Sequence, residues 1–203
     1  LVLWVNDAQR EIALLKPDAS ATNVTVTLAT GTKQDIPNGG NRLLRVVRNM
    51  SAASSGTGKR SVRIVDREVL DAQSPDWHDP TVAGDAAHTT IVKHYVYDDA
   101  NPRNFYVYPG VAGNAYLEII YSSNPAAVAQ NANLSIPDLF ANAVMNYVLY
   151  MAYMKDAEYA GNAERASTHY TLFTNSVMGK GMIDTSTSPN LDTRQPLPIM
   201  GRS

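Results

Sequence analysis

The 203-residue sequence contains no cysteine, which excludes disulfide bonds and thiolate metal sites. It has no basic excess either, since the formal net charge at pH 7 is −2 and tight binding to nucleic-acid phosphates needs clustered cations. The longest apolar run, residues 141–154, is shorter than the roughly 20 residues that cross a bilayer, and Asn142 and Asn146 interrupt it. These absences argue against a membrane protein and against a high-affinity DNA-binding protein.

Complete enzyme motifs are absent as well. Residues 55–60 are similar to a phosphate-binding loop, but Ala53 replaces its first glycine and Arg60 stands where a Ser or Thr hydroxyl would bind magnesium. We predict a hairpin loop there instead. The sequence also lacks the Gly-x-Ser-x-Gly pattern that exposes a nucleophilic serine, so we predict a protein that is not an enzyme and has no cofactor.

One group of polar residues keeps an enzymatic alternative open. Asp76, His78 and Asp79, with His88 and His94 downstream, offer carboxylates and imidazoles that can bind a metal or transfer protons. Their spacing matches no known metal-site pattern. The alternative is therefore a hydrolase acting on nucleic acid or cell wall through Asp76, His78 and Asp79.

Helical periodicity marks both ends of the sequence. Apolar residues at helical spacing predict helices over residues 1–16 and 137–155, and a third that begins between residues 157 and 162. Pro17 ends the first pattern and Gly179 is a C-terminal signal for the third. The apolar stripe expected to pack the first helix consists of Leu1, Trp4, Val5, Ala8, Ile12 and Leu15.

Between these helices the apolar period changes to two, which is typical of strands. A short helix is expected over residues 66–73, and turn-forming clusters separate the β-rich runs. The simplest arrangement is an antiparallel meander. The β-rich runs cover residues 22–28, 43–50, 60–65, 88–97, 104–108 and 115–121.

The sequence beyond Ile183 is rich in Ser, Thr and Asn and contains Pro189, Pro196 and Pro198. Such a segment cannot form its own core, and about 20 residues can extend to roughly 65 Å. We predict an α+β fold with an extended C-terminal arm. Its parts are a helical bundle from residues 1–20 and 130–181, an inserted, mainly antiparallel β domain from 21–129, and the arm from 182–203.

Tyrosines are concentrated in the β-rich region, where Tyr106 and Tyr108 share one strand face. Stacking of nucleic-acid bases on such a face requires a positive groove, but Asp98 and Asp99 lie nearby in the sequence. Strand packing and contact with another protein are therefore the preferred interpretation of this aromatic group.

Five stretches resemble the head-to-tail adaptor, or connector, proteins of short-tailed phages, a family related to tail tubular protein A of T7-like phages. The longest are WVNDAQREI at 4–12, VDREVLDAQSPDWH at 65–78 and KDAEYAGN at 155–162. KHYVYD at 93–98 and FYVYP at 105–109 complete the resemblance. The matched stretches follow the family's order along nearly the whole chain.

The resemblance implies a structural protein of the virion neck, assembled in the host cytoplasm, that forms a homo-oligomeric ring of twelve copies between the portal protein and the tail nozzle protein. DNA would pass through the ring without sequence-specific binding. We expect contacts with the portal from the arm and with the tail from the β domain. The candidate residues are Leu191, Arg194, Leu197, Ile199 and Met200 in the arm, and Tyr106 and Tyr108 facing the tail.

Two expectations remain beside this interpretation. Another neck or tail structural protein, such as a head-completion or nozzle protein, would share the same features. Because Leu1 already lies inside a helical pattern, we also expect the natural chain to begin upstream of it.

Overall fold

The computed structural model describes residues 1–54 and 56–186. The chain divides into two units: a helical unit formed by Leu1–Lys16 together with the chain from Pro125 onward, and a β unit formed by Pro17–Asn124. Helices and two mostly antiparallel sheets make the fold α+β, as the sequence predicts. Among the described residues, no helix combines the length and the apolar character that a membrane span needs.

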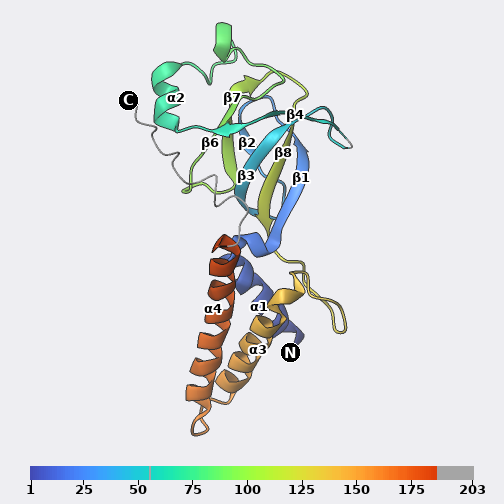
Figure 1. Cartoon of the computed structure of the whole chain (residues 1–203), viewed down its shortest axis with the longest axis vertical. Helices are drawn as coiled ribbons and strands as arrows, with labels where there is room; N and C mark the ends of the chain where they lie inside the picture. Colours follow the sequence, from blue (N-terminus) through green and yellow to red (C-terminus); the bar gives the residue numbers. More distant parts are fainter. Residues whose placement is uncertain (55, 187–203) are drawn as a thin grey trace, which may run out of the picture. The chain divides into compact units, whose positions relative to one another are not determined.

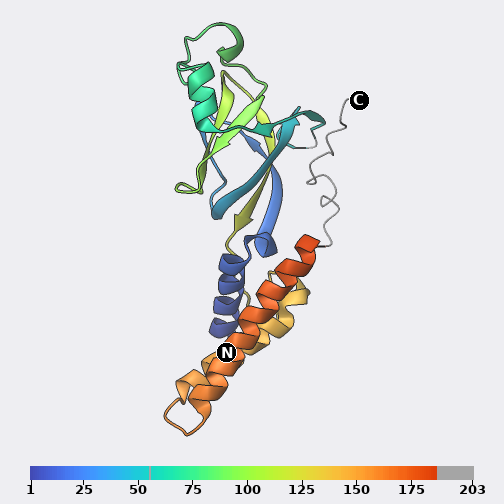
Figure 2. The ribbon, with the colours of Figure 1, turned by 60° about the vertical axis from the view of Figure 1, so that its left-hand side comes forward.

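The helical unit contains three long helices (Figure 1): α1 (Val2–Leu15), α3 (Ala141–Lys155) and α4 (Asn162–Ser186). A short 3-10 turn, η3 (Asp138–Phe140), precedes α3. Helices α3 and α4 lie side by side in Figures 1 and 2. Gly161, just before α4, has a φ of 85°, a left-handed conformation that favours glycine and lets the chain reverse between the two helices.

Helix α4 continues to Ser186, so the prediction that it ends at Gly179 is wrong. A helix usually ends on a glycine that takes positive φ, and Gly179 does not. Beyond it, Asp184 accepts hydrogen bonds from Lys16 of α1's C-terminal end and from Lys180 one turn earlier. These pairs favour continuation of the helix past the glycine.

The β unit contains two four-stranded sheets with strand orders β1-β8-β3-β4 and β2-β7-β6-β5. Every neighbouring pair is antiparallel except β5 and β6. Two 3-10 turns, η1 (Pro17–Ser20) and η2 (Gly84–Ala86), and helix α2 (Arg67–Gln73) complete the unit. The strands are β1 (Ala21–Thr27), β2 (Gly31–Asp35), β3 (Gly40–Met50), β4 (Gly58–Ser61), β5 (Arg63–Ile64), β6 (His94–Tyr97), β7 (Asn104–Val111) and β8 (Tyr116–Ser123).

The expected meander is wrong, because the central strands pair with partners that are distant in sequence. β8 lies between β1 and β3, and β7 lies between β2 and β6. The sequence did not predict β2, whose buried positions Thr32 and Gln34 are polar. The Gln34 amide satisfies the backbone of Ala29 in both directions, at 2.8 Å each, so a polar residue fills a position where the alternating pattern requires an apolar one.

The predicted strand over 88–97 is also too long, since only His94–Tyr97 form β6. Before it, the Thr89 hydroxyl bonds both the N–H and the C=O of Ile91 at 2.9 Å. This local side-chain bonding competes with strand pairing. A single bridge from Thr89 to Val111 remains of the longer strand.

One hydrophobic core joins the two sheets. Leu117 and Ile119 of β8 and Val107 of β7 are fully buried in it. They occupy alternate positions of their strands, as a half-buried sheet requires. A second, smaller core surrounds Trp77, which lies in the loop after α2 and is also fully buried.

Candidate interaction surfaces

Exposed apolar side chains are concentrated on the helical unit. Among the described residues, twelve of the fifteen exposed large hydrophobic side chains belong to it, although the β unit is larger. Contiguous exposed apolar surface commonly marks a protein interface. The twelve are Leu1, Leu3, Leu14, Leu139, Met145, Met154, Tyr159, Tyr170, Leu172, Met178, Met182 and Ile183.

Helix α3 shows the same excess in its sequence. Its residues, ANAVMNYVLYMAYMK, are apolar except for Asn142, Asn146 and Lys155, a composition typical of a helix surrounded by partners. Yet only Ala143 and Val144 are buried in the single chain, and Met145 and Met154 are 56% and 47% exposed. The helix therefore carries more apolar surface than its own chain covers.

An aromatic row joins α3 to α4 and fixes their register. Tyr147 packs edge-on against the buried Phe173 at 5.1 Å between ring centroids, and Tyr153 stacks on His169 at 5.6 Å. Burial, followed by the nearby Glu11 carboxylate, raises the pKa of Tyr147. The row makes the helical hairpin a rigid element, which is the kind of surface a permanent interface uses.

Two buried amides on α1 hold the segment that leads into α3. The Asn6 side chain donates to the Val128 carbonyl at 3.2 Å and accepts from the Val128 N–H at 2.8 Å. The Gln9 amide oxygen accepts from the Ser135 N–H at 2.7 Å and from its hydroxyl at 2.9 Å. These contacts were not expected from the sequence, because the predicted packing stripe of α1 contains only apolar residues.

The buried face of α1 is consequently displaced from the predicted one. Ala8 and Ile12 are buried as expected, but Leu1 is 79% exposed and Trp4, Val5 and Leu15 are only partly covered. Asn6, Gln9 and Ala13 complete the buried face. The displacement leaves Leu1 on the surface, where it joins Leu3 and Leu14, which the predicted stripe did not include.

Charged side chains from the end of α1 and from α4 meet around Phe140. Phe140 is buried, with the Lys16 and Lys180 ammonium groups 5.9 and 5.8 Å from its ring centroid. Asp184 pairs with both lysines. The hydrogen bond from Lys16 is the main reason that the pKa of Asp184 is lowered. These contacts tie the end of α1 to the last turns of α4.

In the β unit, Tyr106 and Tyr108 belong to the small core around Trp77. Tyr108 is buried, and Trp77 packs edge-on against both tyrosines with ring centroids 6.3 Å apart. Tyr106 is partly covered by the Arg67 guanidinium, 5.0 Å from its ring centroid. Of the two residues predicted to face the tail, Tyr106 therefore offers the more accessible side chain.

Two of the three candidate hydrolytic residues, His78 and Asp79, are engaged in local structure. The ring Nδ1 of His78 is 2.7 Å from the Thr32 hydroxyl, and burial followed by nearby Arg67 lowers the pKa of this imidazole. Asp79 accepts from the N–H and the hydroxyl of Thr81, which lowers its pKa. Within the described part of the chain, no cluster of three or more His, Asp or Glu side chains is arranged to hold a metal ion.

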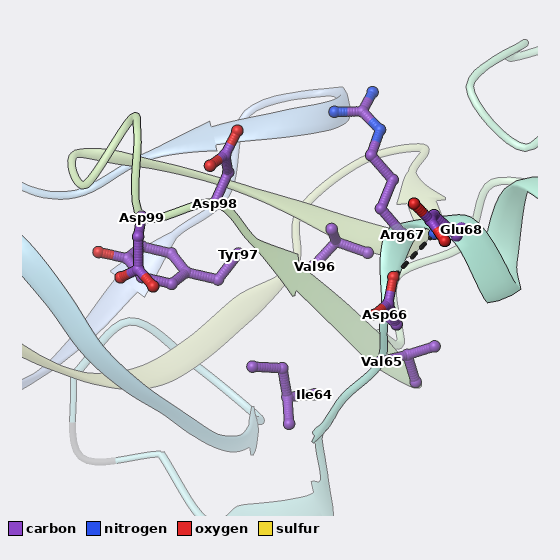
Figure 3. A pocket seen from close by; sticks show the side chains of 9 residues that line it. All are labelled: Ile64, Val65, Asp66, Arg67, Glu68, Val96, Tyr97, Asp98 and Asp99. Atoms are coloured by element: carbon purple, nitrogen blue, oxygen red, sulfur yellow. Dashed lines mark hydrogen bonds between the residues drawn. The ribbon is translucent and has the colours of Figure 1, made fainter.

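An open cavity of about 670 Å³ lies beside α2 (Figure 3). Its floor includes Ile64 and Val96, and carboxylates stand at its rim. Asp66 uses its carboxylate to cap α2 by accepting from the Glu68 N–H at 2.9 Å, and Asp99 pairs with Arg42 at 2.6 Å. Asp66 and Asp99 thus have structural partners, and the described residues contain no cluster of carboxylates arranged to hold a metal ion.

The predicted arm residues are not placed. Residues 187–203 lie outside the described part of the chain. The portal contact predicted for this segment therefore stays a prediction. It concerns Leu191, Arg194, Leu197, Ile199 and Met200.

Comparison with known proteins identifies the family. No curated protein matches the chain. The family model described as SU10 adaptor protein matches residues 1–194, which include both units. That family consists of phage adaptors, structural components of the virion that interact with other phage structural proteins. This chain belongs to the SU10 adaptor protein family.

Proposed function

We propose that the protein is a head-to-tail adaptor, related to tail tubular protein A of T7-like phages, that works as one copy in a ring of twelve in the virion neck. The ring joins the portal protein to the tail nozzle protein and surrounds the channel through which DNA is ejected. Its work is mechanical and needs no cofactor. Membership of the adaptor family supports this function.

The observation that carries the ring is the uncovered apolar surface of the helical unit. Ring subunits contact their neighbours through two different patches, and closure requires rigid surfaces. Leu172 and Met178 of α4 and Met145 of α3 are exposed on helices held in register by the aromatic row. Burial of such side chains contributes roughly 1.5–3 kcal/mol each, which is enough to stabilise assembly.

The proposed portal contact is the C-terminal arm, with Leu191, Arg194, Leu197, Ile199 and Met200 as its anchors. Weak contacts repeated around a ring gain strength through avidity. The proposed tail contact is the surface around Tyr106, with Tyr108 beneath it. The net charge of −2 suits a channel lining, because the chain has no basic excess to retain DNA phosphates.

Assembly tests the proposal. Purified protein mixed with portal rings is expected to form a second ring on the portal, visible by electron microscopy. The double variant Leu172→Asp/Met178→Asp should abolish this ring. Ile91→Asp, which changes an exposed apolar residue of the β unit, is the control and should assemble.

Two outcomes decide against parts of the proposal. A ring that forms without any affinity for the portal favours another neck or tail protein, such as a head-completion or nozzle protein. Deletion of residues 187–203 leaves the described helix α4 intact and should abolish portal binding. Unchanged portal binding after that deletion contradicts the role of the arm.

A further inference from the structure

Three cations lie on the outermost strands of the two sheets. Lys59 and Arg60 are on β4 and Arg63 is on β5, and all three are exposed. We call them the basic edge. Within residues 1–54 and 56–186 none of the three forms an ion pair. Their charge is therefore available to a partner.

Two cations of the basic edge, Arg60 and Arg63, are close enough to influence His94. Burial is the main cause of the lowered pKa of this imidazole, and Arg60, Arg63 and Lys93 lower it further. Arg63 is directly opposite His94 in the β5–β6 pairing. Cations from two successive strands thus produce one positive region.

A second charged segment has the opposite sign. Residues 66–79, which include α2, carry five carboxylates against a single cation, Arg67. We call this the acidic segment. Every one of its carboxylate residues is exposed. Glu68 and Asp76 form no ion pair with any described residue.

Strand β4, which carries Lys59 and Arg60 of the basic edge, and helix α2 lie on different sides of the β unit, whereas Arg63 on β5 is only three residues before Asp66. In Figures 1 and 2, α2 lies on one side of this unit and the β3–β4 hairpin extends on the other. A contact between two different patches on different sides is the arrangement that builds a ring rather than a two-fold dimer. Matching opposite charges at such a contact steers assembly and fixes its register.

We propose that the basic edge of one copy docks against the acidic segment of the next copy. This inference rests on the proposed ring and identifies a contact between β units, in addition to the apolar contacts of the helical units. The partner is a second copy of this chain, because the chain itself supplies the complementary charge. Salt weakens exposed charge pairs, so ring formation should decline between low salt and about 0.5 M salt.

Charge reversal on each side tests the contact. The variants are Lys59→Glu/Arg60→Glu on the basic edge and Glu68→Lys/Asp76→Lys on the acidic segment. None of the four side chains makes a side-chain hydrogen bond or an ion pair within the described chain. Each variant alone is expected to form on the order of tenfold fewer rings, measured by mass photometry and electron microscopy on portal rings.

Mixing the two variants provides the decisive measurement. In an equimolar mixture the reversed edge of the first variant faces the reversed segment of the second, and the unaltered edge of the second faces the unaltered segment of the first. Alternating rings should therefore recover to near the level of the unaltered chain. The matched control is Lys33→Glu/Arg103→Glu, two exposed cations of the β unit without ion pairs in the described residues. This control should assemble normally.

The outcomes separate this inference from the proposed function. If the unaltered chain forms no ring, the proposed function and the inference both fail. If the unaltered chain forms rings and the reversed variants assemble equally well, or the mixture does not recover, only the inference is overturned. Loss of DNA retention by the basic-edge variant, with normal rings, would also overturn it, because the cations would then serve nucleic acid.

Discussion

The indole N–H of Trp77 donates a hydrogen bond to the Asp71 carboxylate at 2.7 Å. This bond joins the loop after α2 to the helix itself, and the Trp77 ring fills the centre of the small core beneath Tyr106 and Tyr108. The shape of the surface that includes Tyr106 therefore depends on a tryptophan that is itself fully buried.

Trp77→Ala should destabilise the β unit by about 3–5 kcal/mol, because it removes a large buried ring and leaves a cavity. Trp77→Phe keeps most of the packing and loses the hydrogen bond, so about 1 kcal/mol is expected. Urea unfolding measures both. As a control, Val69→Ala, at an exposed position of α2, should change the unfolding free energy by less than about 0.5 kcal/mol. Equal effects of the alanine variants would contradict the central role of Trp77.

Gln9→Ala should loosen the segment that leads into α3. The substitution removes the acceptor of the Ser135 N–H and leaves the Ser135 hydroxyl only the Ala126 carbonyl, and the loss of a hydrogen bond costs about 0.5–1.5 kcal/mol. Hydrogen exchange at the Ser135 amide should accelerate, and the unfolding free energy should fall by that amount. Arg10→Ala is the control, since Arg10 is the exposed neighbour that pairs only with Asp7 among the described residues. Unchanged hydrogen exchange at the Ser135 amide would show that Gln9 does not hold this segment.

Acidification should destabilise the β unit from about pH 6.5 downward. Burial lowers the pKa of both His78 and His94 in the folded protein, so the unfolded chain binds more protons once the pH falls below the ordinary histidine value. The stability is complete above that value and is lost as the pH falls through the lowered folded pKa values. Thermal melting between pH 7.5 and 5 measures the change.

His94→Leu should reduce this pH dependence, because it removes an imidazole whose ring Nδ1 is buried without a hydrogen-bond partner in the described structure. Asp79 and Asp184 also have lowered pKa values, but carboxylates contribute in a more acidic range. A melting temperature that stays constant from pH 7.5 to 5 would show that neither histidine is linked to folding.

Asp184→Asn should loosen the last turns of α4. The substitution removes the charge that pairs with Lys16 and Lys180, while the helix can still form. Faster hydrogen exchange is expected for the amides from Lys180 to Asp184, with little change at Phe173. Asp7→Asn on α1 is the matched control, because it breaks an exposed pair with Arg10. If these amides stay protected from hydrogen exchange in Asp184→Asn at low salt, other contacts hold the part of α4 beyond Gly179.

The sequence allowed the fold class and most elements to be predicted. Asp66, at the start of the predicted helix over 66–73, does cap α2, because the capping preference of Asp is a local property of the chain. The pairing of β8 with β1 and β3 could not be predicted, since periodicity defines which residues form a strand and not which strands meet. Only contacts between residues about 100 positions apart establish that order.

Buried polar residues explain why β2 and the buried face of α1 were not predicted correctly. Gln34 stands at a buried position of β2, and Asn6 and Gln9 stand at buried positions of α1. A pattern of apolar and polar residues assigns such side chains to the surface, because it contains no information about backbone groups that need partners. Their partners, such as Val128 and Ser135, are distant in sequence.

Strands β1 and β8 pair without a register shift, with Ala21 opposite Ser122. The two serine hydroxyls of Ser20 and Ser122 are 3.3 Å apart at the same end. The chain thus enters and leaves the β unit at adjacent points. A different β unit needs only one pair of neighbouring chain ends to fit between the same helices, which is the geometry that makes domain insertion tolerable.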